Sequence, residues 1–206
     1  MINIVDYGVG NIFSLKSSLD YLGIKAELTG DPEKILASEK VILPGVGSFG
    51  DAMEMLKRRD LIPAILQVAK KGTPLLGICL GMQILFQRGF EYGEREGLGL
   101  ISGSVEDMNK LLKDKELPLP QMGWNAISFP KDREKSPLFK YTPEGSYVYF
   151  VHSYSAVNCE DSIIATCDYS YPVTAAVAKD NIFGTQFHPE KSGEVGLNIL
   201  KAFHEL

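Results

Sequence analysis

The first residue whose setting indicates chemistry is Cys79, which lies between two glycines in the run Gly77-Ile78-Cys79-Leu80-Gly81. A sharp turn from a strand into a helix exposes a nucleophile, and flanking glycines allow the close backbone approach that such a turn needs. The start of the following helix favours a thiolate and offers free N–H groups to an oxyanion. The run therefore predicts a cysteine nucleophile at the end of a buried strand.

Free cysteines are more commonly small buried hydrophobes, and this is the alternative interpretation for all three cysteines of the chain. Cys159 and Cys167 lack a glycine-flanked turn and keep that interpretation, whereas the glycines around Cys79 favour the nucleophile. No Cys-x-x-Cys or His-Glu-x-x-His spacing occurs, so no metal site is expected.

A cysteine nucleophile needs a base, and the base needs an orienting acid. Among the three histidines, His188 follows a strand-like run and precedes Pro189 and Glu190. Because side chains two residues apart in an extended segment point the same way, the Glu190 carboxylate can reach the imidazole. A lone histidine is more commonly a core or surface residue, but the adjoining Pro-Glu favours His188 as the base. His152 is a weaker candidate for the base, and His204 is expected to be solvated near the end of a helix.

A glycine-rich turn, Pro44-Gly45-Val46-Gly47-Ser48-Phe49-Gly50, follows another predicted strand. It resembles a phosphate cradle, but it lacks the Lys-Ser/Thr ending of a P-loop and the spacing of a dinucleotide fingerprint. Its free N–H groups also suit an oxyanion hole, provided that the turn lies beside Cys79. The carboxyl ends of strands in an open parallel sheet converge at one crevice. One crevice could therefore hold the segments that follow predicted strands, which are Tyr7–Gly10, Pro44–Gly47, Cys79 and His188.

The elements that must position these residues alternate in the first half of the chain. This alternation predicts an α/β fold with an open, mostly parallel central sheet and helices on both faces. The predicted strands are Ile2–Asp6, Lys25–Leu28, Val41–Leu43 and Leu75–Ile78, and the predicted helices are Ile12–Leu22, a short one opened by Asp31-Pro32, Asp51–Lys57 and Leu61–Lys70.

The second half of the chain is richer in predicted strands and closes with a helix. The strands are Val148–Val151, Ile163–Thr166, Val173–Ala178 and Ile182–Phe187, the closing helix is Gly193–Leu206, and the surface loops are Asn109–Pro120 and Pro130–Pro143. No stretch has the composition of a flexible linker. Residues 1–206 are therefore predicted to form a single domain.

Composition and charge exclude several classes of function. The net charge of −5 argues against a nucleic-acid-binding surface, which needs clustered Lys and Arg. The longest apolar runs are too short to span a membrane, and the start of the chain lacks the features of a signal peptide. Three cysteines are too few, and odd in number, for a disulfide framework. The sequence therefore predicts a protein of the reducing cytoplasm.

Taken in order, the motifs resemble the class I, or triad-type, glutamine amidotransferases. Gly77–Gln83 and His188-Pro189-Glu190 resemble the two signature motifs of that family. Four stretches further resemble the amidotransferase subunits of imidazole glycerol phosphate synthase, which belong to that family; these stretches are Asp6–Asn11, Pro44–Gly47, Met122–Asn125 and His188–Ser192. The resemblance spans nearly the whole chain. The resemblance implies a flavodoxin-like fold and no cofactor.

The resemblance also implies a reaction. Cys79 would attack the side-chain amide of L-glutamine and form a thioester, His188 would carry the proton, and Glu190 would orient the imidazole. The backbone N–H groups of Val46 and Leu80 would form the oxyanion hole. Gln83 and the backbone of Gly47, His152, Ser153 and Tyr154 would hold the substrate.

A partner subunit is implied as well. The family resemblance predicts a heterodimer with a (βα)8-barrel cyclase, which takes the ammonia through a tunnel to make imidazole glycerol phosphate and the purine precursor AICAR in histidine biosynthesis. Asn11, Trp124 and Lys191 match positions near that partner. For Trp124, a place in the hydrophobic core is the alternative.

Three other functions are weighed against this one. The chain could be an amidotransferase subunit that serves another synthase, for example one making CTP, tryptophan, pyridoxal phosphate or a surface sugar. It could be a stand-alone cysteine hydrolase of the same fold, which would have no need of Gln83. A silent binding subunit is the least favoured, because it requires a broken triad and all three residues are present.

Overall fold

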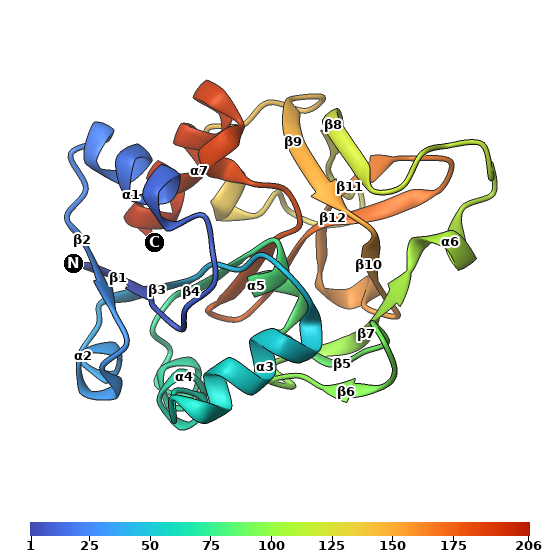
Figure 1. Ribbon diagram of the computed structural model, residues 1–206. Helices are drawn as coiled ribbons and strands as arrows, with labels where there is room; N and C mark the ends of the chain where they lie inside the picture. Colours follow the sequence, from blue (N-terminus) through green and yellow to red (C-terminus); the bar gives the residue numbers. More distant parts are fainter.

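The computed structural model describes residues 1–206, and its central feature is a nine-stranded sheet (Figure 1). The strand order is β2-β1-β3-β4-β13-β12-β11-β8-β9. The parallel half consists of β2 (Ala26–Thr29), β1 (Ile2–Val5), β3 (Lys40–Leu43), β4 (Leu75–Ile78) and β13 (Ile182–Thr185). The antiparallel half continues through β12 (Pro172–Lys179), β11 (Ile163–Asp168), β8 (Gln121–Ser128) and β9 (Tyr147–His152).

Helices cover both faces of the parallel half. On one face lie α1 (Ile12–Tyr21) and α7 (Gly193–Glu205), and on the other lie α2 (Pro32–Leu36), α3 (Phe49–Arg58) and α4 (Ile62–Lys70) (Figure 1). Because both faces are covered, β1 and β4 are buried at every position. The predicted α/β class with flanking helices is confirmed, and the additional strands of the second half extend the sheet in antiparallel fashion.

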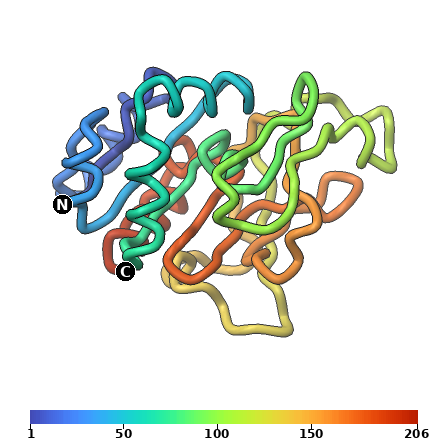
Figure 2. Tube along the Cα trace, turned by 90° about the horizontal axis from the view of Figure 1, so that it is seen from below, coloured from blue at the N-terminus to red at the C-terminus, as the bar shows by residue number.

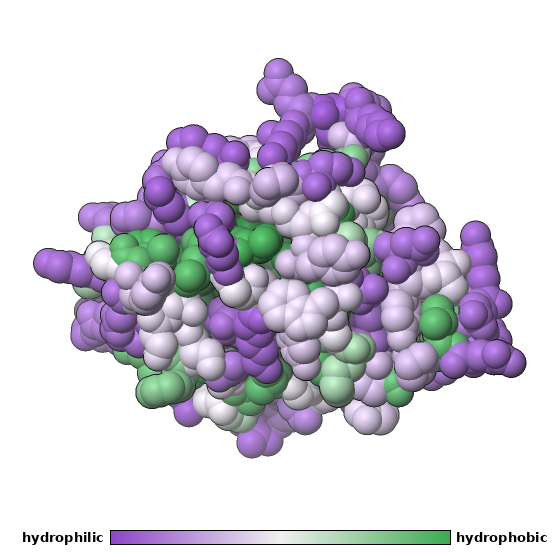
Figure 3. Space-filling model, turned by 90° about the horizontal axis from the view of Figure 1, so that it is seen from above, coloured by the Kyte–Doolittle hydropathy of each residue, from purple (hydrophilic) through white to green (hydrophobic).

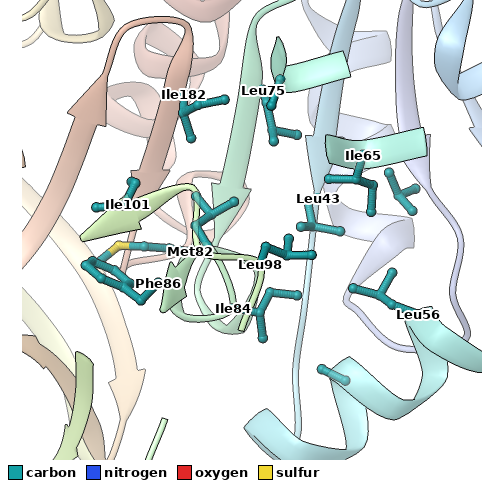
Figure 4. Close-up of a cluster of buried hydrophobic side chains, with 14 of the residues drawn as sticks. Leu43, Leu56, Ile65, Leu75, Met82, Ile84, Phe86, Leu98, Ile101 and Ile182 are labelled. Atoms are coloured by element: carbon teal, nitrogen blue, oxygen red, sulfur yellow. The ribbon is translucent and has the colours of Figure 1, made fainter. Parts of the chain in front are cut away.

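Each face of the sheet has its own hydrophobic core. Leu56 of α3 and Ile65 of α4 pack with Leu75 on one side (Figure 4). Leu19 of α1 and Ile199 of α7 belong to the core on the other side. The sheet between the two cores is thereby fixed in position, and so are the loops that follow its strands.

The sequence did not predict β8 or a second, four-stranded sheet with the order β10-β7-β5-β6. Its strands are β10 (Tyr154–Val157), β7 (Ile101–Asp107), β5 (Phe86–Gly89) and β6 (Arg95–Glu96). Both ends of β5 are buried and its middle is exposed, while β6 is exposed throughout, so neither strand shows the alternation that a sequence pattern reveals.

The predicted surface loops contain short helical turns. The segment Asn109–Pro120 begins within α6 (Met108–Leu111), and Pro130–Pro143 contains a 3-10 turn over Pro137–Phe139. The second of these segments, gold in Figure 2, projects from the body of the molecule. No helix of the protein is long and apolar enough to cross a membrane.

Candidate active site

Cys79 occupies the sharp turn between β4 and α5 (Leu80–Gln83). Its backbone has φ +54° and ψ −111°, a conformation that costs a non-glycine residue energy and that clusters at functional sites. Its N–H donates to the Thr185 carbonyl of β13 at 2.7 Å. A Cβ on Gly81 would lie 1.8 Å from the Leu43 oxygen, so only glycine lets α5 approach β3 this closely. The predicted strand-to-helix turn is confirmed.

The helix after Cys79 is short. α5 spans only four residues, because the chain turns into β5 almost at once. One turn still leaves free N–H groups beside the sulfur, but it lacks the aligned peptide dipoles of a long helix. The stabilisation of the thiolate that the sequence predicts from a helix therefore comes only from the local N–H groups.

His188 and Glu190 lie next to each other behind Cys79. The His188 Nδ1 is 2.8 Å from the Glu190 Oε1, and both side chains are buried. A 3-10 turn over Pro189–Lys191 follows His188. The Ser192 hydroxyl donates to the His188 carbonyl at 2.6 Å and accepts from the Tyr149 N–H at 3.0 Å. The local backbone thus holds the imidazole and the carboxylate in one geometry.

The electrostatics of His188 indicate a charged imidazole. Burial alone lowers its pKa, but the Cys79 sulfur and the Glu190 carboxylate outweigh burial and raise the pKa to about 9. The His188 Nε2 is buried and makes no hydrogen bond of ordinary geometry. An imidazolium beside a thiolate is the pairing that activates a cysteine near neutral pH.

The sulfur opens into a cavity of about 480 Å³ between the carboxyl ends of the parallel strands and the second sheet. Nearly all the predicted catalytic and substrate residues line it; they are Val46, Gly47, Cys79, Leu80, Gln83, Ser153, Tyr154 and His188, with Lys191 of the predicted interface at its edge. Glu190 lies behind His188, and Asn11 and Trp124 lie elsewhere. A larger hollow of about 580 Å³ adjoins over α3 and β6, but no cysteine or histidine lines it.

Comparison with known proteins decides the family. The sequence model of the family described as "Glutamine amidotransferase class-I" matches residues 3–205. The chain belongs to this family. The "Imidazole glycerol phosphate synthase subunit HisH" of Wolinella succinogenes is 46% identical over 207 residues, covering 100% of both chains. The protein of the same name from Bacillus cereus strain G9842 is 50% identical over 204 residues, covering 98% of this chain and 93% of the relative.

Solved structures of more distant proteins share the fold. A crystal structure of a glutamine amidotransferase superposes with a TM-score of 0.74 at 16% identity, covering 98% of each chain. PurLQS from Thermotoga maritima superposes with a TM-score of 0.75 at 20% identity, covering 99% of this chain and 97% of that one. At such identities the likeness concerns the fold alone.

Within this amidotransferase, Gln83 has a defined orientation. Its Nε2 donates to the Tyr154 carbonyl at 3.1 Å and to the Gln186 Oε1 at 3.0 Å. Both amide hydrogens are therefore used, and the Gln83 Oε1 remains as a free acceptor on the cavity side.

Glu91, which also lines the cavity, accepts from the Phe49 N–H at 2.7 Å, and burial raises its pKa. Sequence reasoning missed both Glu91 and Gln186: Glu91 lies in no recognisable motif, and Gln186 lies two residues before His188 but has a side chain type that does not by itself indicate chemistry.

His152 lines the amidotransferase cavity as a neutral side chain. Its Nδ1 is 2.8 Å from the Tyr154 carbonyl, so Nδ1 carries the proton and donates. Burial lowers its pKa to about 4. It has no carboxylate partner of the kind that Glu190 provides to His188. His188 is therefore better placed than His152 to serve as the base.

The buried His152 predicts an acid-dependent loss of stability. Between pH 6.5 and 4 the unfolded chain takes up a proton at this histidine and the folded chain does not, so the free energy of unfolding falls as pH falls. The loss at pH 5 is about 2 kcal/mol. Urea unfolding at pH 7 and pH 5 should show a smaller loss in His152→Gln than in the wild type. His204→Gln, at an exposed position, is the control, and equal losses in all three proteins would contradict the prediction.

The residues predicted to face a partner lie on the surface. Trp124, on β8, is 53% exposed, so the alternative that places it in the core is wrong. Its ring meets Tyr149 edge-on with centroids 6.0 Å apart, and the Lys191 Nζ is 5.8 Å from the centroid of the same tyrosine. Asn11 directly precedes α1. Figure 3, which looks down on the side of α7 and β9, shows small hydrophobic areas set among hydrophilic side chains.

Proposed function

We propose that this amidotransferase is the glutamine-hydrolysing subunit of an imidazole glycerol phosphate synthase. The observation that carries the proposal is the buried Cys79–His188–Glu190 arrangement, whose sulfur opens into a cavity that is also lined by Gln83 and Glu91. Full-length relatives named as HisH subunits of that synthase, at 46% and 50% identity, support the choice of pathway. A single domain over residues 1–206 and a location in the cytoplasm belong to the same proposal.

The proposed reaction has two halves. The Cys79 thiolate attacks the side-chain amide carbon of L-glutamine, and the backbone N–H groups of Val46 and Leu80 stabilise the oxyanion. His188 gives its proton to the departing ammonia, which leaves a glutamyl thioester. His188 then takes a proton from water as the water attacks the thioester, and glutamate leaves. Glu190 orients the imidazole in both halves and supports its positive charge whenever His188 is protonated.

The cavity also offers groups for the amino-acid end of the substrate. The free Oε1 of Gln83 and the carboxylate of Glu91 are acceptors, and both suit the α-ammonium group of glutamine. The backbone of Gly47, Ser153 and Tyr154 lines the same cavity and completes the proposed substrate site. No metal or cofactor takes part in this scheme.

The proposed partner is a (βα)8-barrel cyclase that forms a heterodimer with this chain and consumes its ammonia. We assign Asn11, Trp124 and Lys191 to that interface. The exposed Trp124 and the cation–aromatic contact between Lys191 and Tyr149 support this assignment, because exposed aromatic rings are enriched where proteins associate.

The first experiment measures glutamate release from glutamine by the chain alone and then with the cyclase and its nucleotide substrate. We expect a large rise in rate when both are added, because the partner completes the ammonia route. Equal rates with and without them would contradict the pathway, and would instead favour another synthase or a stand-alone hydrolase. A pull-down from the native host that returns a different synthase would contradict it as well.

A further inference from the structure

Gln186 is a fully buried side chain beside the nucleophile. It directly follows β13, and its backbone N–H donates to the Ala175 carbonyl of β12 at 2.8 Å. Its Nε2 donates to the Cys79 Sγ at 3.7 Å. Gln186 does not line the cavity, so it reaches the sulfur from the protein side and cannot serve as a substrate contact.

The orientation of the Gln186 amide is fixed by its neighbours. The Tyr154 carbonyl can only accept, so the Gln83 atom that meets it at 3.1 Å is the Nε2. That same nitrogen meets Gln186 at 3.0 Å and donates to it, so the Gln186 atom there is the Oε1. The Gln186 Nε2 is consequently the atom that faces the sulfur.

We propose that Gln186 belongs to the catalytic machinery and stabilises the Cys79 thiolate by donating an amide hydrogen bond to its sulfur. A hydrogen bond to a charged acceptor in a buried site shifts an equilibrium by about ten- to a hundredfold. The bond acts at two stages, before the sulfur attacks glutamine and again when the sulfur leaves the thioester. These kinetic consequences rest on the proposed glutaminase reaction, whereas the effect on the thiol does not.

The contact also connects the substrate site to the nucleophile. Gln83 lines the cavity and holds the amide of Gln186, and Gln186 in turn holds the sulfur. Gln83 therefore lies two hydrogen bonds away from the reacting sulfur, along a path that does not pass through His188, and a substrate bound at its Oε1 would add a third.

The test is the pH dependence of Cys79 alkylation by iodoacetamide, followed by mass spectrometry of the Cys79 peptide. In Gln186→Met, which keeps an unbranched side chain but removes the N–H groups, the midpoint of the rate profile should move up by about one pH unit. The matched control is Gln121→Met. Gln121 is also fully buried and donates to a cysteine sulfur, that of Cys167 at 3.4 Å, but away from the triad.

An unchanged midpoint in folded Gln186→Met, or the same shift in Gln121→Met, would overturn the proposal. If Gln186→Met does not fold, Gln186→Asn provides the test, because it keeps the amide but retracts it from the sulfur; it too should raise the midpoint, and an unchanged midpoint overturns the proposal again. Alkylation needs neither glutamine nor cyclase. Failure of the proposed function, seen as no glutamate release by the wild type with its partner, is thereby distinguished from failure of this inference.

Discussion

Cys79→Ser is expected to abolish glutamine-driven synthesis and to leave synthesis from free ammonia intact. A serine hydroxyl stays protonated beside His188, so the attack on glutamine should slow by about a thousandfold or more. Ammonia supplied from solution enters the reaction after the step that Cys79 performs, and the cyclase should use it at the wild-type rate. The two substrates therefore separate the chemistry of this chain from that of its partner.

The measurement uses the reconstituted heterodimer with glutamine or ammonium as the only nitrogen source. Cys159→Ser is the control, because Cys159 is buried next to Thr174, outside the cavity, and burial raises its pKa to about 11. This control should retain both activities. Loss of the ammonia-driven activity in Cys79→Ser would contradict the proposed division of labour between the two subunits.

The parallel half of the fold could be predicted because its signals are local. β1 and β4 are short, mostly apolar runs, and the Asp31 side chain caps α2 by accepting a hydrogen bond from the Glu33 N–H, as its position before Pro32 predicts. The second sheet could not be predicted, because its strands are defined by distant partners. β10 pairs with β7 far away in the sequence, and no local pattern encodes that pairing.

The residues of the candidate site likewise divide into those that a local sequence pattern indicates and those that it does not. The prediction of Cys79, His188 and Glu190 rests on glycines and a proline within two residues of them. These neighbours indicate the local backbone geometry directly from the sequence. The roles of Glu91 and Gln186 depend on side-chain contacts that no local pattern encodes, since the Gln186 amide is oriented by Gln83 and faces the Cys79 sulfur. Such contacts are visible only in the folded molecule.

Gly81→Ala is expected to reduce glutaminase activity by about a hundredfold without changing any triad residue. A Cβ at position 81 would lie 1.8 Å from the Leu43 oxygen, which must retreat by more than about 1 Å. Leu43 leads directly into Pro44–Gly47, so the proposed oxyanion donor at Val46 moves with it. A displacement of that size at a catalytic group, or the loss of one oxyanion donor, lowers the reaction rate by about a hundredfold. The overpacking should also lower the free energy of unfolding by about 1–3 kcal/mol.

Glutaminase kinetics, thermal unfolding and iodoacetamide alkylation of Cys79 together check this prediction. Gly50→Ala is the control, because its Cβ would meet only the flexible Arg95 side chain at 3.5 Å, within α3. This control should keep its activity and gain slightly in stability. Alkylation of Cys79 in Gly81→Ala should persist, since the thiol and His188 stay in place. Wild-type activity in folded Gly81→Ala would contradict the assignment of Val46, because it would mean that the backbone after β3 can move without affecting the reaction.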